Sequence, residues 1–267
     1  MTKTDFVVIS LIVALSLVTL VPTLHQIGLT FDEPTYFDLS RSYMKWLSEL
    51  KNSWLQGNLA EPFDQPMIDY YWRSTDAHPP LGKLLSGITH ELFKNQIGEI
   101  AGFRLSAVLF FSVLLIFLYL FLLRVCNRTA AIFACLALIS MPRVWGHAHI
   151  AALDVPTSTL WVVFFYSFWR GTGNRTWSIV AGILFGLGLL TKITFAFALV
   201  PLLVWGMIFC RKSITSNIIA NGTISPLLFF LGWPWLWYDT WARLAAYLSF
   251  HLKHYPVPVL YLGTQFF

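Results

Sequence analysis

The chain has 267 residues, of which 57% are hydrophobic and 12% are charged, and its formal net charge is +5. The charged share is about half that of ordinary soluble domains, which excludes a water-soluble globular enzyme. The basic balance does not indicate a nucleic-acid partner, because basic residues in membrane proteins collect in loops that set orientation. No basic patch interleaved with aromatic residues accompanies it.

Long apolar runs predict an all-α polytopic membrane protein, because each span needs about 20 predominantly apolar residues. The first run, at about 6–25, is too long for the apolar part of a signal peptide and no A-x-A site follows it, so we expect an uncleaved first span. Six further spans follow a large polar loop at 26–99. They are expected at about 100–123, 129–141, 153–169, 177–190, 194–210 and 215–237.

The loop at 26–99 is predicted to carry helices that lie on the membrane surface. Residues 34–51 alternate apolar and charged side chains with helical spacing, and a second helix is expected from Leu81 to about Phe93. Residues 57–77, which are rich in proline, aspartate and aromatic residues, are expected to be irregular. A third juxtamembrane helix is expected at about 239–252.

Basic residues in the short loops predict the orientation, because cytoplasmic loops of membrane proteins carry an excess of lysine and arginine. These residues occur in the links after the second, fourth and sixth spans. They are Arg124, Arg128, Arg170, Arg175, Arg211 and Lys212. The large loop and the links at 142–152 and 191–193 then face the non-cytoplasmic side, where every candidate polar motif gathers.

Asp32 and Glu33 form an acidic pair where the first span meets water. An aspartate beside a membrane interior is desolvated, which raises its pKa and suits a general base. The competing interpretation is a helix N-cap, since Asp followed by Glu-Pro is a common start of a helix.

Asp154 precedes the expected fourth span, and His147 lies seven residues before it. Seven residues are two helical turns, so the two side chains can share one face. Asp154 also fits a helix cap before Pro156. Carboxylates and histidines bind divalent metals, so Asp32 and Asp154 are metal candidates, although the spacing matches no dedicated zinc motif.

Lys192 occupies a short turn between two apolar spans on the expected non-cytoplasmic side, against the orientation bias. It could be a lysine that extends from a helix end toward the membrane surface, or a cation that binds a phosphate there. Lys83 and Arg104 could join it in the second case.

The order of these motifs resembles one superfamily. The motifs are Asp32-Glu33 after the first span, His-Pro-Pro-Leu at 78–81, His147-x6-Asp154-x-Pro and Thr191-Lys192. They resemble those of the polyprenyl-phosphate-dependent glycosyltransferases of the GT-C fold, especially protein O-mannosyltransferases and aminoarabinose lipid A transferases. The segment 254–263 also resembles a stretch that follows the seventh span in bacterial members.

The resemblance implies an inverting glycosyltransferase that moves a sugar from a polyprenyl phosphate to a hydroxyl of a protein, lipid or glycan on the non-cytoplasmic face. It implies Asp32 as catalytic base, and Glu33 as its support or as a contact of the acceptor. Donor-phosphate ligands would be Lys192, Arg104 and Lys83, and His78, His147 and Asp154 would shape the donor pocket. A divalent metal ion assists in some relatives. The compartment would be a bacterial inner membrane, or the ER membrane in a eukaryote.

The family usually continues with further membrane helices and often a soluble domain, so we expect one catalytic module over 1–267 without those later parts. Two alternatives remain open. A transporter or channel subunit would place charges within its spans, whereas these spans have few charges in their middles. A non-catalytic scaffold would keep the fold without turnover.

Overall fold

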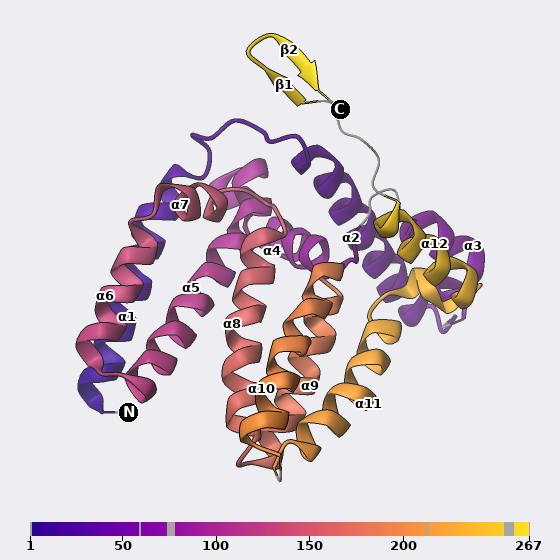
Figure 1. Ribbon diagram of the computed structural model, residues 1–267. Coiled ribbons are helices and arrows are strands. Elements are labelled where there is room, and N and C mark those ends of the chain that lie inside the picture. Colours follow the sequence, from indigo (N-terminus) through magenta and orange to yellow (C-terminus); the bar gives the residue numbers. More distant parts are fainter. Residues whose placement is uncertain (1, 59, 74–77, 212, 254–258, 267) are drawn as a thin grey trace.

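The computed structural model describes residues 2–58, 60–73, 78–211, 213–253 and 259–266. Figure 1 shows a bundle of upright helices, with a group of shorter helices lying across its upper end and to one side. The upright helices occupy the places that the apolar runs predict. They are α1 (Lys3–Leu20), α5 (Glu99–Val125), α6 (Arg128–Ile139), α8 (Asp154–Gly171), α9 (Arg175–Leu189), α10 (Leu199–Phe209) and α11 (Thr215–Leu231).

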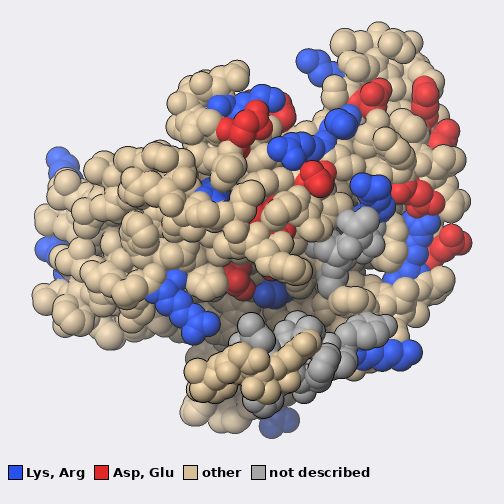
Figure 2. Space-filling model, turned by 90° about the horizontal axis from the view of Figure 1, so that it is seen from above, with Lys and Arg blue, Asp and Glu red and all other residues tan. Residues whose placement is uncertain are grey.

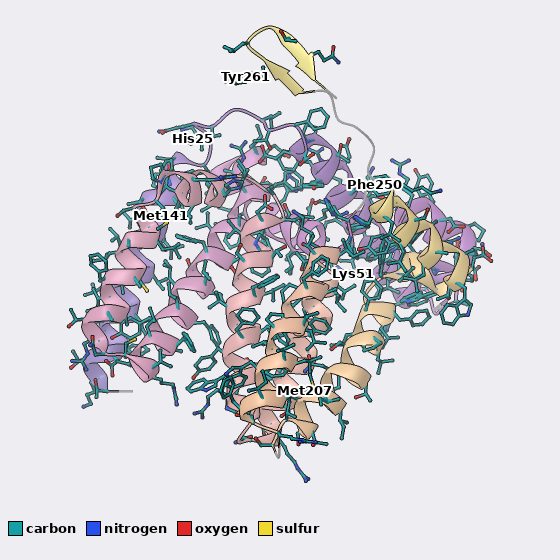
Figure 3. The ribbon with its side chains drawn as sticks, in the orientation of Figure 1. His25, Lys51, Met141, Met207, Phe250 and Tyr261 are labelled. Carbon is teal, nitrogen blue, oxygen red and sulfur yellow. The ribbon has the colours of Figure 1, made fainter. Side chains whose placement is uncertain are left out.

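The remaining elements connect these helices or lie at their upper end. They are η1 (Val21–Thr23), α2 (Glu33–Leu55), η2 (Glu61–Phe63), α3 (Gln65–Tyr71), α4 (Leu81–Ile97), α7 (Pro142–Ala148), η3 (Ile193–Ala198), η4 (Pro234–Trp237), α12 (Thr240–Leu252), β1 (Val259–Tyr261) and β2 (Thr264–Phe266). The interfacial helices expected at 34–51, 81–93 and 239–252 therefore form as α2, α4 and α12. Figure 3 labels His25 and Met207, which lie at opposite ends of the bundle.

Candidate membrane spans are fewer than the seven predicted. Lys3–Thr23 and Glu99–Val125 are long and apolar enough to cross a bilayer, and α6 with α7 counts as a third if this pair, bent by 71°, is one span. The 15 residues of α9 rise only about 22 Å, which is less than the roughly 30 Å of hydrocarbon. Length and composition therefore support two or three spans among the described residues.

The expected seventh span, 215–237, ends early. Helix α11 stops at Leu231, and Gly232 and Trp233 lead into the separate turn η4. Pro234 disfavours helical backbone at the preceding Trp233, which has φ −125° and ψ 82°. Trp233 is then buried against Leu190 and Tyr247 rather than exposed at the membrane surface.

The prediction that 57–77 is irregular was wrong for part of this range, because η2 and α3 form there. Aromatic packing holds α3 onto α2: Trp72 stacks on Tyr43 with ring centroids 4.5 Å apart and meets Trp46 edge-on at 5.1 Å. Trp46 also donates a hydrogen bond of 2.8 Å to the Pro62 carbonyl. These contacts join residues distant in sequence, so local composition does not reveal them.

The all-α prediction holds for the bundle, but the chain also contains the antiparallel pair β1–β2, in which Leu260 faces Gln265. Part of the family-like segment 254–263 thus forms this hairpin, and residues 254–258 lie outside the described part of the chain.

Two apolar clusters hold the upright helices together. One joins α1, α5 and α6 through Leu20, Phe111 and Cys135. The other joins α8, α9 and η3 through Phe164, Phe185 and Phe195. Helix α5 packs against α1, α6 and α8 and so connects both clusters, while α4 lies against its upper end. The polar motifs are carried above this apolar frame, and Figure 2 shows acidic and basic side chains grouped on that upper face.

Candidate active site

A buried ion pair joins the predicted acidic motif to α5. Glu33 and Arg104 are both fully buried. Arg104 Nε donates to Glu33 Oε1 and Arg104 Nη2 donates to Glu33 Oε2, each over 2.7 Å. This is a two-point arginine–carboxylate pair, the geometry in which such pairs are strongest.

Arg104 uses its remaining donors on the chain that follows the first helix. Nη1 donates to the carbonyls of Leu24 and Ile27, and Nη2 donates to the carbonyl of Gly28. A guanidinium has five N–H groups, and these bonds together with the pair to Glu33 occupy all of them. Arg104 therefore has no N–H group left to bind a lipid phosphate, although the sequence predicted it as a phosphate ligand.

Glu33 likewise accepts two backbone hydrogen bonds besides those of Arg104. The N–H of Thr30 donates to Oε2 over 2.9 Å, and the N–H of Ala151 donates to Oε1 over 3.0 Å. Burial by itself raises the pKa of Glu33, but these hydrogen bonds and the positive charge of Arg104 outweigh it and lower that pKa. Glu33 is therefore a charged anchor between the first loop and the 149–153 link.

Asp32 lies at the N-cap position of α2, yet its side chain makes no capping hydrogen bond. It is exposed, in contrast to its buried neighbour Glu33. Asp32 therefore occupies the N-cap position through its backbone, but its side chain does not cap the helix. Because Glu33 is fixed, the backbone of Asp32 is fixed as well, and its carboxylate is exposed to solvent.

Asp154, Lys192 and His147 form a cluster of charged and polar side chains. Lys192 Nζ donates to Asp154 Oδ1 over 3.1 Å, and His147 Nδ1 lies 3.5 Å from Asp154 Oδ2. Asp154 begins α8 without acting as its side-chain cap. The structure therefore brings together three predicted residues that lie on α7, on α8 and immediately before η3.

His78 and Lys83 lie near this cluster. Lys83 is buried, donates to the His78 carbonyl over 2.7 Å and lies 5.8 Å from the Tyr36 ring centre. Burial lowers the pKa of His78 to about 4, and the charges of Lys83, Lys192 and His251 act in the same direction, while Asp154 opposes them. The imidazole of His78 is therefore neutral at physiological pH.

A pocket of about 250 Å³ opens beside His147 and Asp154, and its wall is mostly apolar. Its lining comes from α5, α6, α7 and α8. The residues are Phe111, Leu114, Leu138, Arg143, Val144, His147, Asp154, Val155 and Ser158. The pocket thus combines a charged mouth with an apolar interior.

Arg143 is a pocket residue that the sequence reasoning missed. It is exposed, and no ion pair links it to another residue in the described part of the chain. A basic residue in a link assigned to the non-cytoplasmic side departs from the orientation bias, as Lys192 does. This departure could have identified Arg143 from the sequence.

His149 has a different position from His147. Its Nε2 lies 2.7 Å from Thr23 Oγ1 and its Nδ1 lies 2.7 Å from the Trp145 carbonyl oxygen, so it joins α7 to η1. Within the described ranges, no three His, Cys, Asp or Glu side chains form a group that could hold a metal ion. Asp154 instead contacts Lys192, and we assign no step to a metal.

The depressed pKa of His78 predicts an acid-sensitive contribution to stability. The unfolded chain, with an ordinary histidine pKa of about 6.5, binds more protons than the folded chain between about pH 4 and 6.5, so stability rises with pH there. The contribution is lost as the pH falls through about 4. We expect His78→Asn to flatten the dependence of the apparent Tm on pH between 4 and 7, compared with the exposed-histidine control His25→Asn. Equal slopes in the two variants would contradict this.

The family described as dolichyl-phosphate-mannose-protein mannosyltransferase matches residues 77–238. Among curated proteins, no sequence matches this chain.

Two solved structures share the fold. ArnT from Cupriavidus metallidurans in the apo state is 20% identical, with a TM-score of 0.53 over 68% of this chain and 35% of that one. The S. cerevisiae protein O-mannosyltransferase Pmt1-Pmt2 complex bound to the sugar donor is 15% identical, with a TM-score of 0.58 over 94% of this chain and 34% of that one. The chain therefore spans about a third of the length of each matched chain.

Proposed function

Because the chain belongs to the dolichyl-phosphate-mannose-protein mannosyltransferase family of GT-C membrane glycosyltransferases, we propose that it transfers a sugar from a polyprenyl phosphate to an acceptor hydroxyl. The reaction takes place on the non-cytoplasmic face of a membrane in which the seven upright helices lie together as one module. The hydrogen bond from the Ala151 N–H to Glu33 carries this proposal. It ties the loop that presents Asp32 to the link that leads into Asp154.

The donor lipid enters the apolar pocket between α5 and α8, and its phosphate lies at the charged mouth. Lys192, on one side of Asp154, and Arg143, in the pocket wall, supply the positive charges there. Lys83 adds a buried positive charge nearby. A phosphate that leaves with its electrons is stabilised best by cations that are already in position at a site with little water.

The acceptor hydroxyl approaches from the exposed side of Asp32. Its oxygen forms a bond to the anomeric carbon while the bond from that carbon to the phosphate oxygen breaks. Asp32 takes the hydroxyl proton, and the lipid phosphate leaves with the bonding electron pair. Attack on the face opposite the leaving group inverts the anomeric centre.

Glu33 and Arg104 act as positioning residues in this scheme, since their polar atoms are occupied by each other and by backbone groups. His78 is neutral, and its Nδ1 has no hydrogen-bond partner among the described residues, so it is available to a sugar hydroxyl. His147 orients Asp154, and Asp154 in turn holds Lys192 in place.

The test is binding and consumption of a polyprenyl-phosphate sugar by the purified protein and its Lys192→Ala variant. Loss of a charge-assisted hydrogen bond costs about 1.5–3 kcal/mol, so we expect the donor Kd to rise roughly 10- to 100-fold. Lys192→Arg keeps the charge and should retain most of the affinity. Unchanged binding in Lys192→Ala would remove this lysine from the donor site. Donor binding without turnover in the wild type would instead indicate a non-catalytic scaffold.

A further inference from the structure

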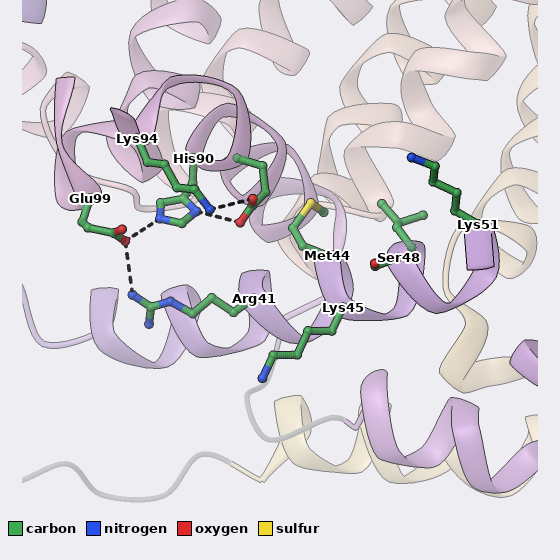
Figure 4. A pocket seen from close by; sticks show the side chains of 10 residues that line it. Arg41, Met44, Lys45, Ser48, Lys51, His90, Lys94 and Glu99 are labelled. Atoms are coloured by element: carbon green, nitrogen blue, oxygen red, sulfur yellow. Dashed lines mark hydrogen bonds and ion pairs between the residues drawn. The ribbon is translucent and has the colours of Figure 1, made fainter. Parts of the chain in front are cut away.

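A second hollow lies between α2 and α4, and it shares no residue with the donor pocket. It measures about 750 Å³ and is shown in Figure 4. Its wall consists mainly of charged side chains from one face of α2, from the C-terminal half of α4 and from the first residue of α5. The residues are Arg41, Met44, Lys45, Leu47, Ser48, Lys51, His90, Glu91, Lys94 and Glu99.

The charges in this hollow are unevenly paired. Lys94 is bound to Glu91 at 2.8 Å, and Glu99 is bound to His90 at 2.6 Å. Arg41 lies 3.2 Å from Asp38 and 4.0 Å from Glu99.

Lys45 and Lys51 stand in a different situation. Both side chains are exposed, and neither has an ion pair or hydrogen bond with any residue that the structure describes. They lie six positions apart on the same helix and line the same hollow. The hollow therefore offers two uncompensated positive charges to a ligand.

An apolar trough continues the hollow toward the end of α2. It measures about 330 Å³ and is lined by Leu47, Leu50, Lys51, Trp54 and Leu55. Leu47 and Lys51 line both cavities, so the two are adjacent. Trp54 is 70% exposed and Leu55 is 75% exposed, which makes this an unusually bare apolar end for a helix in water.

We propose that this groove, the charged hollow together with the trough, binds an anionic phospholipid of the surrounding bilayer. The phosphate of the headgroup lies between Lys45 and Lys51, and the first part of an acyl chain lies along Leu47, Trp54 and Leu55. An amphipathic helix with lysines on its polar face is the element that recognises anionic lipid surfaces. A sugar phosphate or another small phosphate would leave the trough empty.

The consequence is that the acidic-motif helix is held to the membrane surface by a lipid. Helix α2 starts at Asp32 and Glu33 and carries the groove on its later turns. Beside the groove, α2 packs on α4 through Ser40, whose hydroxyl donates to the Lys83 carbonyl over 2.7 Å. A lipid in the groove would thus fix the interfacial helices that flank the donor site without contacting the donor.

The experiment is native mass spectrometry of the detergent-purified protein titrated with phosphatidylglycerol or with phosphatidylcholine. Each lysine near a membrane surface contributes about 1 kcal/mol, so Lys45→Gln with Lys51→Gln should weaken phosphatidylglycerol binding roughly 30-fold. Phosphatidylcholine binding should change little. The matched control is Lys3→Gln with Arg175→Gln, which removes the same charge from exposed positions at the opposite end of the bundle.

Two further arms identify the source of the phosphate. Leu47→Ser with Trp54→Ser should weaken phosphatidylglycerol binding, and glycerol 3-phosphate at matched concentrations should fail to displace the lipid. Displacement by glycerol 3-phosphate would show a site for free phosphate and overturn the proposal. Equal losses in the groove variant and in the charge control would show a general charge effect and overturn it as well.

Discussion

Asp32→Asn is expected to lower the rate of sugar transfer by about two to four orders of magnitude, the usual contribution of a general base. Asparagine keeps the size of the side chain but cannot accept the hydroxyl proton. Donor binding should be unchanged, because the donor cations lie on other elements. The measurement is single-turnover consumption of a polyprenyl-phosphate sugar, together with the donor Kd.

The same substitution should leave the fold intact. The Asp32 side chain is exposed and makes no capping hydrogen bond, so its replacement removes no hydrogen bond or ion pair within the described part of the chain. Asp64 offers a matched control. It is also an exposed aspartate at the N-cap of a helix, again without a side-chain capping bond. Asp64→Asn should keep full activity, and an equal loss in both variants would remove Asp32 from the reaction.

Glu33→Gln is expected to act on stability. Breaking a buried ion pair by neutralising one partner leaves the other charge uncompensated, which typically costs about 3–5 kcal/mol. Arg104 would keep its bonds to the carbonyls of Leu24, Ile27 and Gly28 but would lose its counter-ion. We expect a lower apparent Tm in detergent and poor recovery of monodisperse protein, whereas Asp32→Asn shows neither.

A double variant separates the pair from its surroundings. Glu33→Gln with Arg104→Met removes both charges, so the loss should be smaller than the sum of the two single losses. Additive losses would show that the pair contributes nothing beyond its separate bonds to the backbone. Because the pKa of Glu33 is lowered in the fold, its contribution is complete above the ordinary carboxyl pKa and is lost as the pH falls through the folded value.

Much of the architecture could be predicted from the sequence because it depends on local periodicity. Apolar runs gave the positions of the upright helices, and the amphipathic pattern gave α2 and α4. The order of short motifs predicted the family, which the match over 77–238 confirms. The number of complete spans was not predictable in this way, because helix length depends on breaks such as the one at Gly232 and Trp233.

The candidate site could likewise be predicted from the sequence only in part. Asp154, His147 and Lys192 were each singled out by position, and the structure brings them together. Their partnership required the fold, because Asp154 and Lys192 are 38 residues apart in the chain. Arg143 was missed, although a basic residue in a link assigned to the non-cytoplasmic side departs from the orientation bias.

The adjacent acids Asp32 and Glu33 show most clearly what the sequence determined and what the tertiary structure decided. The sequence determined that two carboxylates stand where the first helix meets water, which follows from the end of an apolar run. It could not tell them apart, because neighbours in sequence have the same local surroundings. The fold separates them. Arg104 on α5, which lies 71 residues after Glu33 in the chain, forms a buried two-point pair with Glu33, while Asp32 is exposed to solvent. Roles of adjacent charged residues depend on partners distant in sequence, because desolvation and pairing act through space rather than along the chain.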